Sequence, residues 1–227
     1  MKYNILLFDA DNTILDFDKA ENQALERAFS ECGLHFDADV LQIYRKNNIR
    51  QWQLFEQGKL TKSEVLTSRF VETFKELHLT SSIDEVARLY ELYLHDGFLV
   101  IDGAAEVLEK LKQFCRLYLV SNGVLSIQNS RMRGSGLDKY FIKRFVSEEI
   151  GYPKPKIEYF NACFANIENF DKDKTLIIGD SLTSDIQGGV NAGIDTCWFN
   201  PNHIENNSHL APTYEIDDLC NLLKIVG

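Results

Sequence analysis

The sequence predicts an α/β fold in which a parallel β-sheet core is interrupted, early in the chain, by an all-helical insert. An apolar run at residues 5–8 has the length of a buried strand, and residues 17–98 show only helical periodicity. From residue 100 onward, short β-rich runs alternate with helical stretches. Because this alternation is typical of βαβ units with parallel strands, the first strand and the later strands belong to one sheet.

The insert contains four expected helices. Apolar residues recur at three- and four-residue spacing in residues 20–32, 38–55, 62–77 and 83–98. Gly33, Gly58 and the polar run Thr80-Ser81-Ser82 separate these helices. Residues 1–16 and 100–227 are therefore expected to form the α/β core. Residues 17–99 are expected to form a helical cap over the carboxyl ends of the strands.

The remaining expected strands and helices alternate along the second part of the chain. The expected strands are residues 117–120, 144–147, 176–179 and 196–199, and the expected helices are residues 103–114, 126–135, 157–165 and 184–192. Polar segments follow four of the five strands. In open α/β sheets ligands bind at the carboxyl ends of the strands, so these segments predict one site.

Three of these segments offer complementary chemistry. Asp9 and Asp11 follow the first strand, and extended geometry would direct both carboxylates to one side of the chain. Ser121-Asn122-Gly123 offers a hydroxyl group and backbone amides to an anion. Lys154 lies between two prolines, which stiffen its loop. Each segment alone is also explained as a turn, but their shared position at strand ends favours a site.

A fourth segment, residues 179–185, adds the carboxylates of Asp180 and Asp185. Alone, it is also explained as the cap of the following helix. Clustered carboxylates are electrostatically costly unless a cation binds among them. Magnesium suits such a site because it prefers oxygen ligands and keeps positions for water and substrate phosphate.

Composition and charge limit the class of function. The 227 residues are 44% hydrophobic and 26% charged, as in soluble globular proteins. A net charge of -10 argues against a DNA or RNA partner, and an anionic small substrate would need a local cation. The apolar run before Asp9 is too short for a signal peptide and no stretch approaches membrane-spanning length, so we expect a cytoplasmic protein. Five scattered cysteines predict neither a disulfide framework nor a zinc site.

The motif order D-x-D-x-T, S-N-G, K-P and G-D-x-x-x-x-D, with a helical insert between the first two, resembles the haloacid dehalogenase-like hydrolase superfamily with a helical, C1-type cap and a Rossmann-like core. Residues 177–189 and 192–201, with Gln128 and Arg131, resemble its bacterial pyrimidine 5'-nucleotidase branch. This resemblance implies Mg²⁺-dependent hydrolysis of a small phosphorylated substrate, a nucleoside monophosphate. The sequence carries no indication of the oligomeric state.

The resemblance also implies roles for individual residues. Asp9 would attack phosphorus and form an aspartyl-phosphate, and Asp11 would protonate the leaving oxygen and later activate water. Magnesium would be held by Asp9, Asp180, the backbone carbonyl of Asp11 and, directly or indirectly, Asp185. The phosphoryl oxygens would be held by Ser121, Asn122 and Lys154.

Several alternatives stay open. A dehalogenase is disfavoured because that chemistry generally lacks an acid at the position of Asp11. A phosphomutase, or a phosphatase of sugar phosphates or phosphoglycolate, would use the same residues. A non-catalytic binding protein is disfavoured by the complete motif set. Residues 188–193 lack the spacing of a dinucleotide-binding fingerprint.

Two aromatic residues of the insert are candidates for substrate choice. Trp52 and Phe55 lie three positions apart, on one face of an expected helix. Either ring could stack on a nucleobase, an interaction worth about 1–3 kcal/mol in nucleic-acid systems. Aromatic residues at this spacing are also typical of a packed helix core.

Overall fold

The chain folds into two compact units, which a computed structural model describes over residues 1–80 and 83–227. The first unit comprises Met1–Asp16 and Phe98–Gly227, and the second comprises Phe17–Gly97. Of the expected breaks between cap helices, Ser81 and Ser82 lie outside the described residues. Among the residues that are described, no helix is both long enough and apolar enough to cross a membrane.

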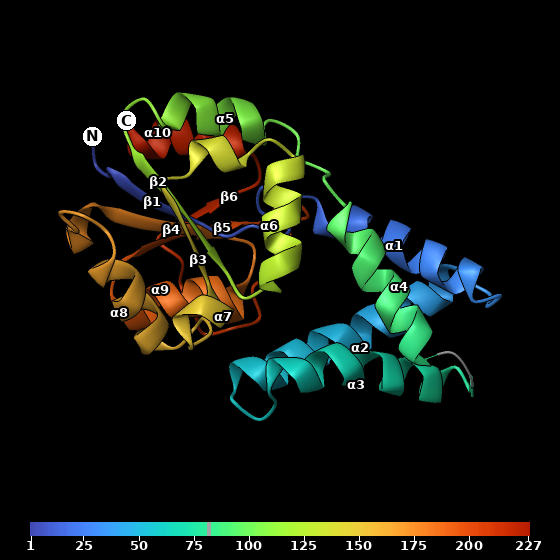
Figure 1. Cartoon of the computed structure of the whole chain (residues 1–227). Coiled ribbons are helices and arrows are strands. Elements are labelled where there is room, and N and C mark those ends of the chain that lie inside the picture. The colour runs from blue at the N-terminus through green and yellow to red at the C-terminus, as the bar shows by residue number, and fades with distance from the viewer. Residues whose placement is uncertain (81–82) are drawn as a thin grey trace. The chain divides into compact units, whose positions relative to one another are not determined.

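The first unit is built on a six-stranded parallel sheet with the order β3-β2-β1-β4-β5-β6 (Figure 1). The strands are β1 (Ile5–Phe8), β2 (Arg116–Ser121), β3 (Lys143–Val146), β4 (Thr175–Gly179), β5 (Asp195–Phe199) and β6 (Tyr214–Ile216). The central strand β1 pairs Phe8 with Leu119 of β2 and with Ile178 of β4. The segments that follow these three strands therefore meet at one edge of the sheet, and the predicted α/β fold is confirmed.

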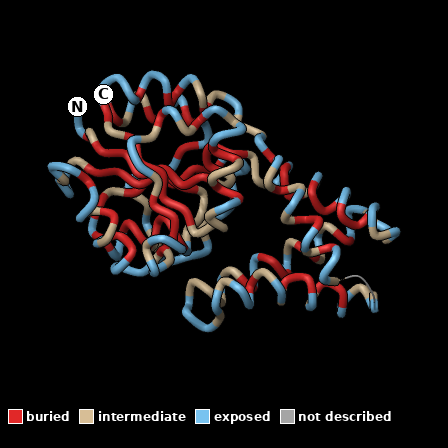
Figure 2. The backbone as a smooth tube through the Cα atoms, viewed as in Figure 1, coloured by how far each residue is buried: buried red, intermediate tan, exposed pale blue. Residues whose placement is uncertain are grey.

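Helices cover both faces of the sheet. Along β1, Leu6 and Phe8 pack into one apolar cluster, whereas Ile5 and Leu7 pack into another, as the two-residue period of a strand requires. One face carries α5 (Ala104–Leu111), α6 (Leu125–Gly134) and α10 (Leu222–Val226), and the other carries α7 (Ser147–Ile150), α8 (Ile157–Ala165) and α9 (Gln187–Ala192) (Figure 1). The strands are consequently buried on both sides (Figure 2), which explains their continuous apolar runs.

Several short elements differ from the sequence prediction. The strand β6 and the helices α7 and α10 were not expected, and Ser147 begins α7 instead of ending β3. The helix expected at residues 184–192 begins earlier, as the π-helical turn η3 (Leu182–Ile186) that leads into α9. Single turns η1 (Asp138–Tyr140), η2 (Lys172–Lys174) and η4 (Leu219–Asn221) complete the unit. Segments of three to five residues are too short for apolar periodicity to reveal them.

The second unit consists of α1 (Phe17–Glu31), α2 (Ala38–Glu56), α3 (Lys62–Glu76) and α4 (Ile83–His95). Asp37 caps α2 by accepting a hydrogen bond from the backbone of Val40, and Thr61 and Glu64 form a capping box that begins α3. The interior is aromatic. The rings of Tyr44, Phe70 and Tyr90 lie with centroids 5.2 to 5.7 Å apart.

Candidate active site

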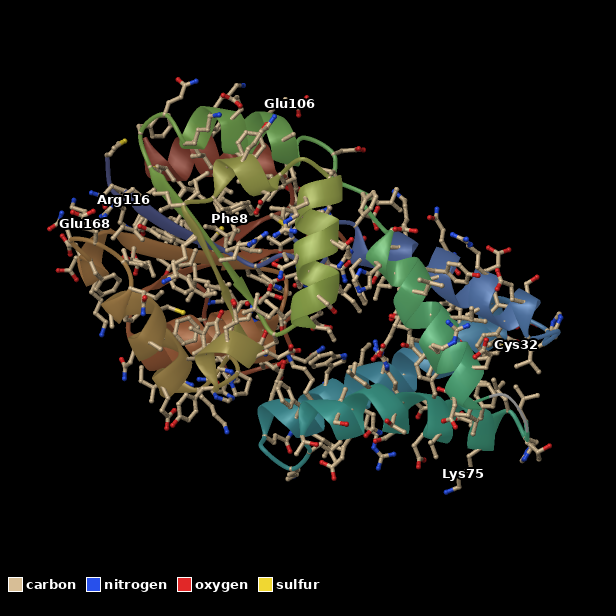
Figure 3. All side chains as sticks on the ribbon, in the orientation of Figure 1. Phe8, Cys32, Lys75, Glu106, Arg116 and Glu168 are labelled. Carbon is tan, nitrogen blue, oxygen red and sulfur yellow. The ribbon has the colours of Figure 1, made fainter. Side chains whose placement is uncertain are left out.

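Asp9 leaves the sheet at the carboxyl end of β1. Phe8, the last strand residue, lies inside the α/β unit (Figure 3). The N–H of Asp9 still donates to the carbonyl of Ile178 at 2.9 Å, which extends the pairing with β4 by one residue. The chain then turns at Asn12, whose φ of 55° is a left-handed conformation that Asn tolerates. This turn leaves the Asp9 side chain inside the site, where the residue is only 7% exposed.

Lys154 connects the segments that follow three different strands. Its ammonium group donates to Asp9 Oδ1 at 2.6 Å, to Asp185 Oδ1 at 2.7 Å and to the carbonyl of Val120 at 3.1 Å. The Asn122 side chain accepts from the backbone N–H of Lys154 and donates to its carbonyl, both at 2.9 Å. The Asn122 amide therefore fixes the Lys154 backbone, and the contact of Asn122 with a phosphoryl oxygen stays a prediction.

Ser121 offers a hydroxyl hydrogen beside this network. Its Oγ accepts hydrogen bonds from the N–H of Gly123 at 2.9 Å and from Gln128 Nε2 at 3.1 Å. Since both lone pairs of the oxygen are then occupied, the hydroxyl group can act as a donor toward an anion. Gly123 is required for this geometry, because a Cβ there would lie 2.5 Å from Gln128 Nε2.

Three carboxylates converge at the same place. Asp9, Asp180 and Asp185 each offer one oxygen, and these oxygens lie within 4.8 Å of one another. The loop around them is tightly fixed: Ser181 N–H donates to Asp185 Oδ2 at 3.2 Å, and Trp198 Nε1 donates to the Asp180 carbonyl at 2.8 Å. Asp185 packs so closely on Gly179 that any Cβ there would clash with its carboxylate.

The cluster contains three carboxylates but only one ammonium group, that of Lys154. Burial raises the pKa of Asp9 to about 7, against the opposing influence of Lys154. Burial and the nearby Asp9 charge raise the pKa of Asp180 well above its usual value. For Lys154, burial alone would lower the pKa, but Asp185 and Asp9 outweigh it and the pKa lies above its usual value. Three carboxylates around one ammonium group form an oxygen donor set with excess negative charge, which fits Mg²⁺.

Asp11 has different partners from Asp9. Arg131 Nη1 donates to Asp11 Oδ1 in a salt bridge, and Gln128 Nε2 donates to Asp11 Oδ2. The Asp11 side chain is thus outside the group of three carboxylates, and the metal contact expected of its backbone carbonyl stays a prediction. Sequence reasoning gave Gln128 and Arg131 no role. Their spacing of three residues, which puts them on one face of α6, is the signal that could have identified them as a pair.

The two aromatic candidates lie on α2, in the second unit. The rings of Trp52 and Phe55 pack edge to face, with centroids 5.6 Å apart, and both residues are half-buried. The Lys62 ammonium group lies 5.8 Å from the centroid of the Phe55 ring. Contact of either aromatic side chain with a nucleobase stays a prediction.

Comparison with known proteins agrees with the motif resemblance. A family model described as haloacid dehalogenase-like hydrolase matches residues 6–199. The chain is 43% identical to the HAD-hydrolase YfnB of Bacillus subtilis (strain 168), covering 100% of this chain and 96% of YfnB. A crystal structure of YfnB described as bound to magnesium has a TM-score of 0.94 and covers 100% of both chains.

Two further relatives are named as pyrimidine 5'-nucleotidases. PynA of Streptococcus pneumoniae (strain ATCC BAA-255 / R6) is 39% identical, over 98% of this chain and 94% of its own length. YjjG of Escherichia coli (strain K12) is 30% identical, over 100% of this chain and 99% of its own length. The predicted resemblance to this superfamily, with pyrimidine 5'-nucleotidases among the relatives, is confirmed.

Proposed function

Since the chain belongs to the haloacid dehalogenase-like hydrolase family, we propose that it is a magnesium-dependent phosphomonoester hydrolase that acts through an aspartyl-phosphate. The observation that carries the proposal is the position of Lys154, whose ammonium group joins Asp9 and Asp185 beside a separately held Asp11. The proposed substrates are pyrimidine ribonucleoside and deoxyribonucleoside 5'-monophosphates. This substrate class is supported by the full-length similarity to PynA and YjjG.

The proposed cofactor is Mg²⁺, for which Asp9, Asp180 and Asp185 would supply oxygen ligands. When bound, Mg²⁺ would offset the excess carboxylate charge and polarise the phosphoryl oxygens. The magnesium-bound description of the YfnB structure supports this assignment.

In the first step, a carboxylate oxygen of Asp9 attacks phosphorus, and the bond from phosphorus to the substrate's ester oxygen breaks. The electron pair of that bond goes to the leaving oxygen, which takes a proton from Asp11. The Ser121 hydroxyl and the Lys154 ammonium group stabilise the phosphoryl oxygens as charge develops on them. The products of this step are the free alcohol and the aspartyl-phosphate.

In the second step, Asp11 takes a proton from a water molecule whose oxygen attacks phosphorus. The bond between phosphorus and Asp9 breaks, the Asp9 carboxylate is regenerated, and inorganic phosphate leaves. Asn122 contributes by positioning, because its two hydrogen bonds to the Lys154 backbone hold the ammonium group against Asp9.

The test is phosphate release, in Mg²⁺ and then in EDTA, from UMP, dUMP, dTMP, purine monophosphates, sugar phosphates and phosphoglycolate. We expect magnesium-dependent release that is strongest for the pyrimidine monophosphates. Strongest release from a sugar phosphate or phosphoglycolate would retain the chemistry and exclude the nucleotidase assignment. Formation of an isomeric sugar phosphate would favour a phosphomutase, and no reaction at all would refute the catalytic proposal.

Variants of the two catalytic carboxylates should differ from each other. Asp9→Asn should abolish both turnover and the phosphoenzyme, because the nucleophile is lost. Asp11→Asn should slow turnover by roughly 10²–10⁴-fold and leave some phosphoenzyme detectable. Asp173→Asn, at an exposed position before β4, is the matched control and should retain full activity. Full activity in either catalytic variant would overturn the mechanism.

Substrate choice is proposed to involve the aromatic pair of α2. Trp52→Ala and Phe55→Ala should each weaken the preference for pyrimidine over purine monophosphates, since the proposed contact is stacking on the base. The measurement is kcat/KM for UMP and for a purine monophosphate in the folded variants. An unchanged ratio in both variants would exclude this role.

A further inference from the structure

The helix α6 supplies two side chains to a single carboxylate. Gln128 and Arg131 lie one turn apart on α6, and each donates to a different oxygen of Asp11. The two residues thus fix the orientation of Asp11 about both of its side-chain bonds, which a single contact would not do.

Gln128 connects Asp11 with the expected phosphate-binding segment. The two hydrogens of its amide group go to Asp11 Oδ2 and, over 3.1 Å, to Ser121 Oγ. The absence of a side chain at Gly123 is what allows this approach. The orientation of Asp11 is therefore tied to that of the Ser121 hydroxyl.

Arg131 is fully buried next to a partly exposed carboxylate. Its side chain is 0% exposed, whereas the side chain of its partner Asp11 is 28% exposed. Burying a guanidinium group is costly unless its charge is matched, and here the matching charge is a carboxylate that stays partly exposed. A buried, immobile Arg131 side chain would hold one side of the Asp11 carboxylate in place while the carboxylate exchanges a proton.

We propose that Gln128 and Arg131 are positioning residues for proton transfer by Asp11: together they hold its carboxylate at the distance and angle at which it protonates the leaving oxygen. This inference rests on the proposed phosphomonoester hydrolysis, in which Asp11 is the acid and base. Both residues act through Asp11, because each donates a hydrogen bond to one of its carboxylate oxygens. A misplacement of a catalytic group by about 1 Å costs on the order of 10²-fold in rate.

The test compares two leaving groups. The first is the best alkyl phosphate of the substrate panel, such as UMP, whose alkoxide needs a proton to leave. The second is p-nitrophenyl phosphate, whose phenolate leaves without one. Arg131→Met should lower kcat/KM for the alkyl phosphate by about 10²-fold and for p-nitrophenyl phosphate by a few-fold at most. Arg131→Lys, which keeps the charge, should restore part of the loss.

Further variants separate positioning from general damage. Gln128→Met should show the same leaving-group difference and, because it also releases Ser121, a raised KM for both substrates. Arg133→Met, an arginine replacement at an exposed position of the same helix, should leave both reactions unchanged. In an Asp11→Asn background, adding Arg131→Met should cause no further loss on the alkyl phosphate, because the residue acts through Asp11.

Each outcome has a defined meaning. Equal losses on both substrates, no loss on either, or additive losses in the Asp11→Asn background would overturn the positioning role. If Arg131→Met does not fold, Arg131→Lys and Gln128→Met provide the same comparison. If the wild-type protein hydrolyses neither phosphate, the proposed function itself fails, which is a different result from the failure of this inference.

Discussion

Replacement of Lys154 by Met removes the ammonium group from the centre of the site. Its Nζ lies 2.6 Å from Asp9 and 2.7 Å from Asp185, and the Lys154 side chain is 1% exposed. Methionine fills a similar volume without charge, so the two carboxylates would remain buried without their cation. Breaking a buried ion pair by removing one partner costs about 3–5 kcal/mol.

This cost predicts a large change in thermal stability. In a protein of this size, 1 kcal/mol corresponds to roughly 2–4 °C in melting temperature, so Lys154→Met should melt about 6–20 °C below wild type in EDTA. Magnesium should raise the melting temperature of Lys154→Met, because a cation that binds only the folded state stabilises it. Lys156→Met is the matched control, since Lys156 is exposed and only two positions away.

Thermal unfolding of the three proteins, followed by circular dichroism in EDTA and in Mg²⁺, is the assay. A melting temperature of Lys154→Met equal to that of Lys156→Met in EDTA would refute the electrostatic reasoning. It would mean that the carboxylates do not depend on the ammonium group for their stability. No turnover is expected from Lys154→Met in either buffer, because the proposed stabilisation of the phosphoryl oxygens by Lys154 would be lost as well.

Three further predictions concern other parts of the chain. Burial raises the folded-state pKa of Glu21, in the second unit, from its usual 4.5 to about 7, despite the opposing influence of Arg45. The stabilising contribution of its protonated form is therefore present below about pH 4.5 and is lost as the pH rises through 7, a change of about 3 kcal/mol. Glu21→Gln should therefore gain melting temperature relative to wild type over this pH range, and a constant difference would contradict the shift. Trp198, one of two tryptophans, donates a hydrogen bond to the backbone carbonyl of Asp180. In Trp52→Phe, where Trp198 is the remaining tryptophan, the fluorescence should therefore respond to Mg²⁺. An unchanged spectrum at saturating Mg²⁺ would count against the metal site. Gly123→Ala should displace Gln128 and lower kcat/KM by about 10-fold, and wild-type kinetics would show that the loop adapts.

The sheet could be predicted closely because its strands are buried on both faces. The first strand was expected at residues 5–8 and is Ile5–Phe8, bounded by the charge of Asp9. The strand β6 escaped prediction because Tyr214–Ile216 is a three-residue strand at the sheet edge with an exposed Glu215 at its centre. Only its pairing with β5 identifies it, and pairing is not visible in a local pattern.

For the candidate site, residue types and spacing indicated which side chains would gather, but not what each would touch. Asp11 and Arg131 are separated by 120 positions, and Asp9 and Lys154 by 145. Asn122 is an example: its amide group makes two hydrogen bonds to the Lys154 backbone, a contact that the sequence did not predict. Such a role follows from the path of a neighbouring loop, which the sequence motif does not encode.

The cations at this edge of the sheet have separate partners: Lys154 pairs with Asp9 and Asp185, whereas Arg131 pairs with Asp11. A carboxylate that gains and loses a proton in each turnover alters the electric field at every neighbouring charged group. Asp11 affects the pKa of Asp9 less than Lys154 and Asp185 do, and its own charge is met by Arg131. If all the carboxylates shared Lys154, each proton transfer would disturb the nucleophile and the proposed metal ligands. In the proposed mechanism, a separate guanidinium group behind Asp11 would allow Asp11 to exchange its proton while Asp9 and Asp185 keep their contacts with Lys154.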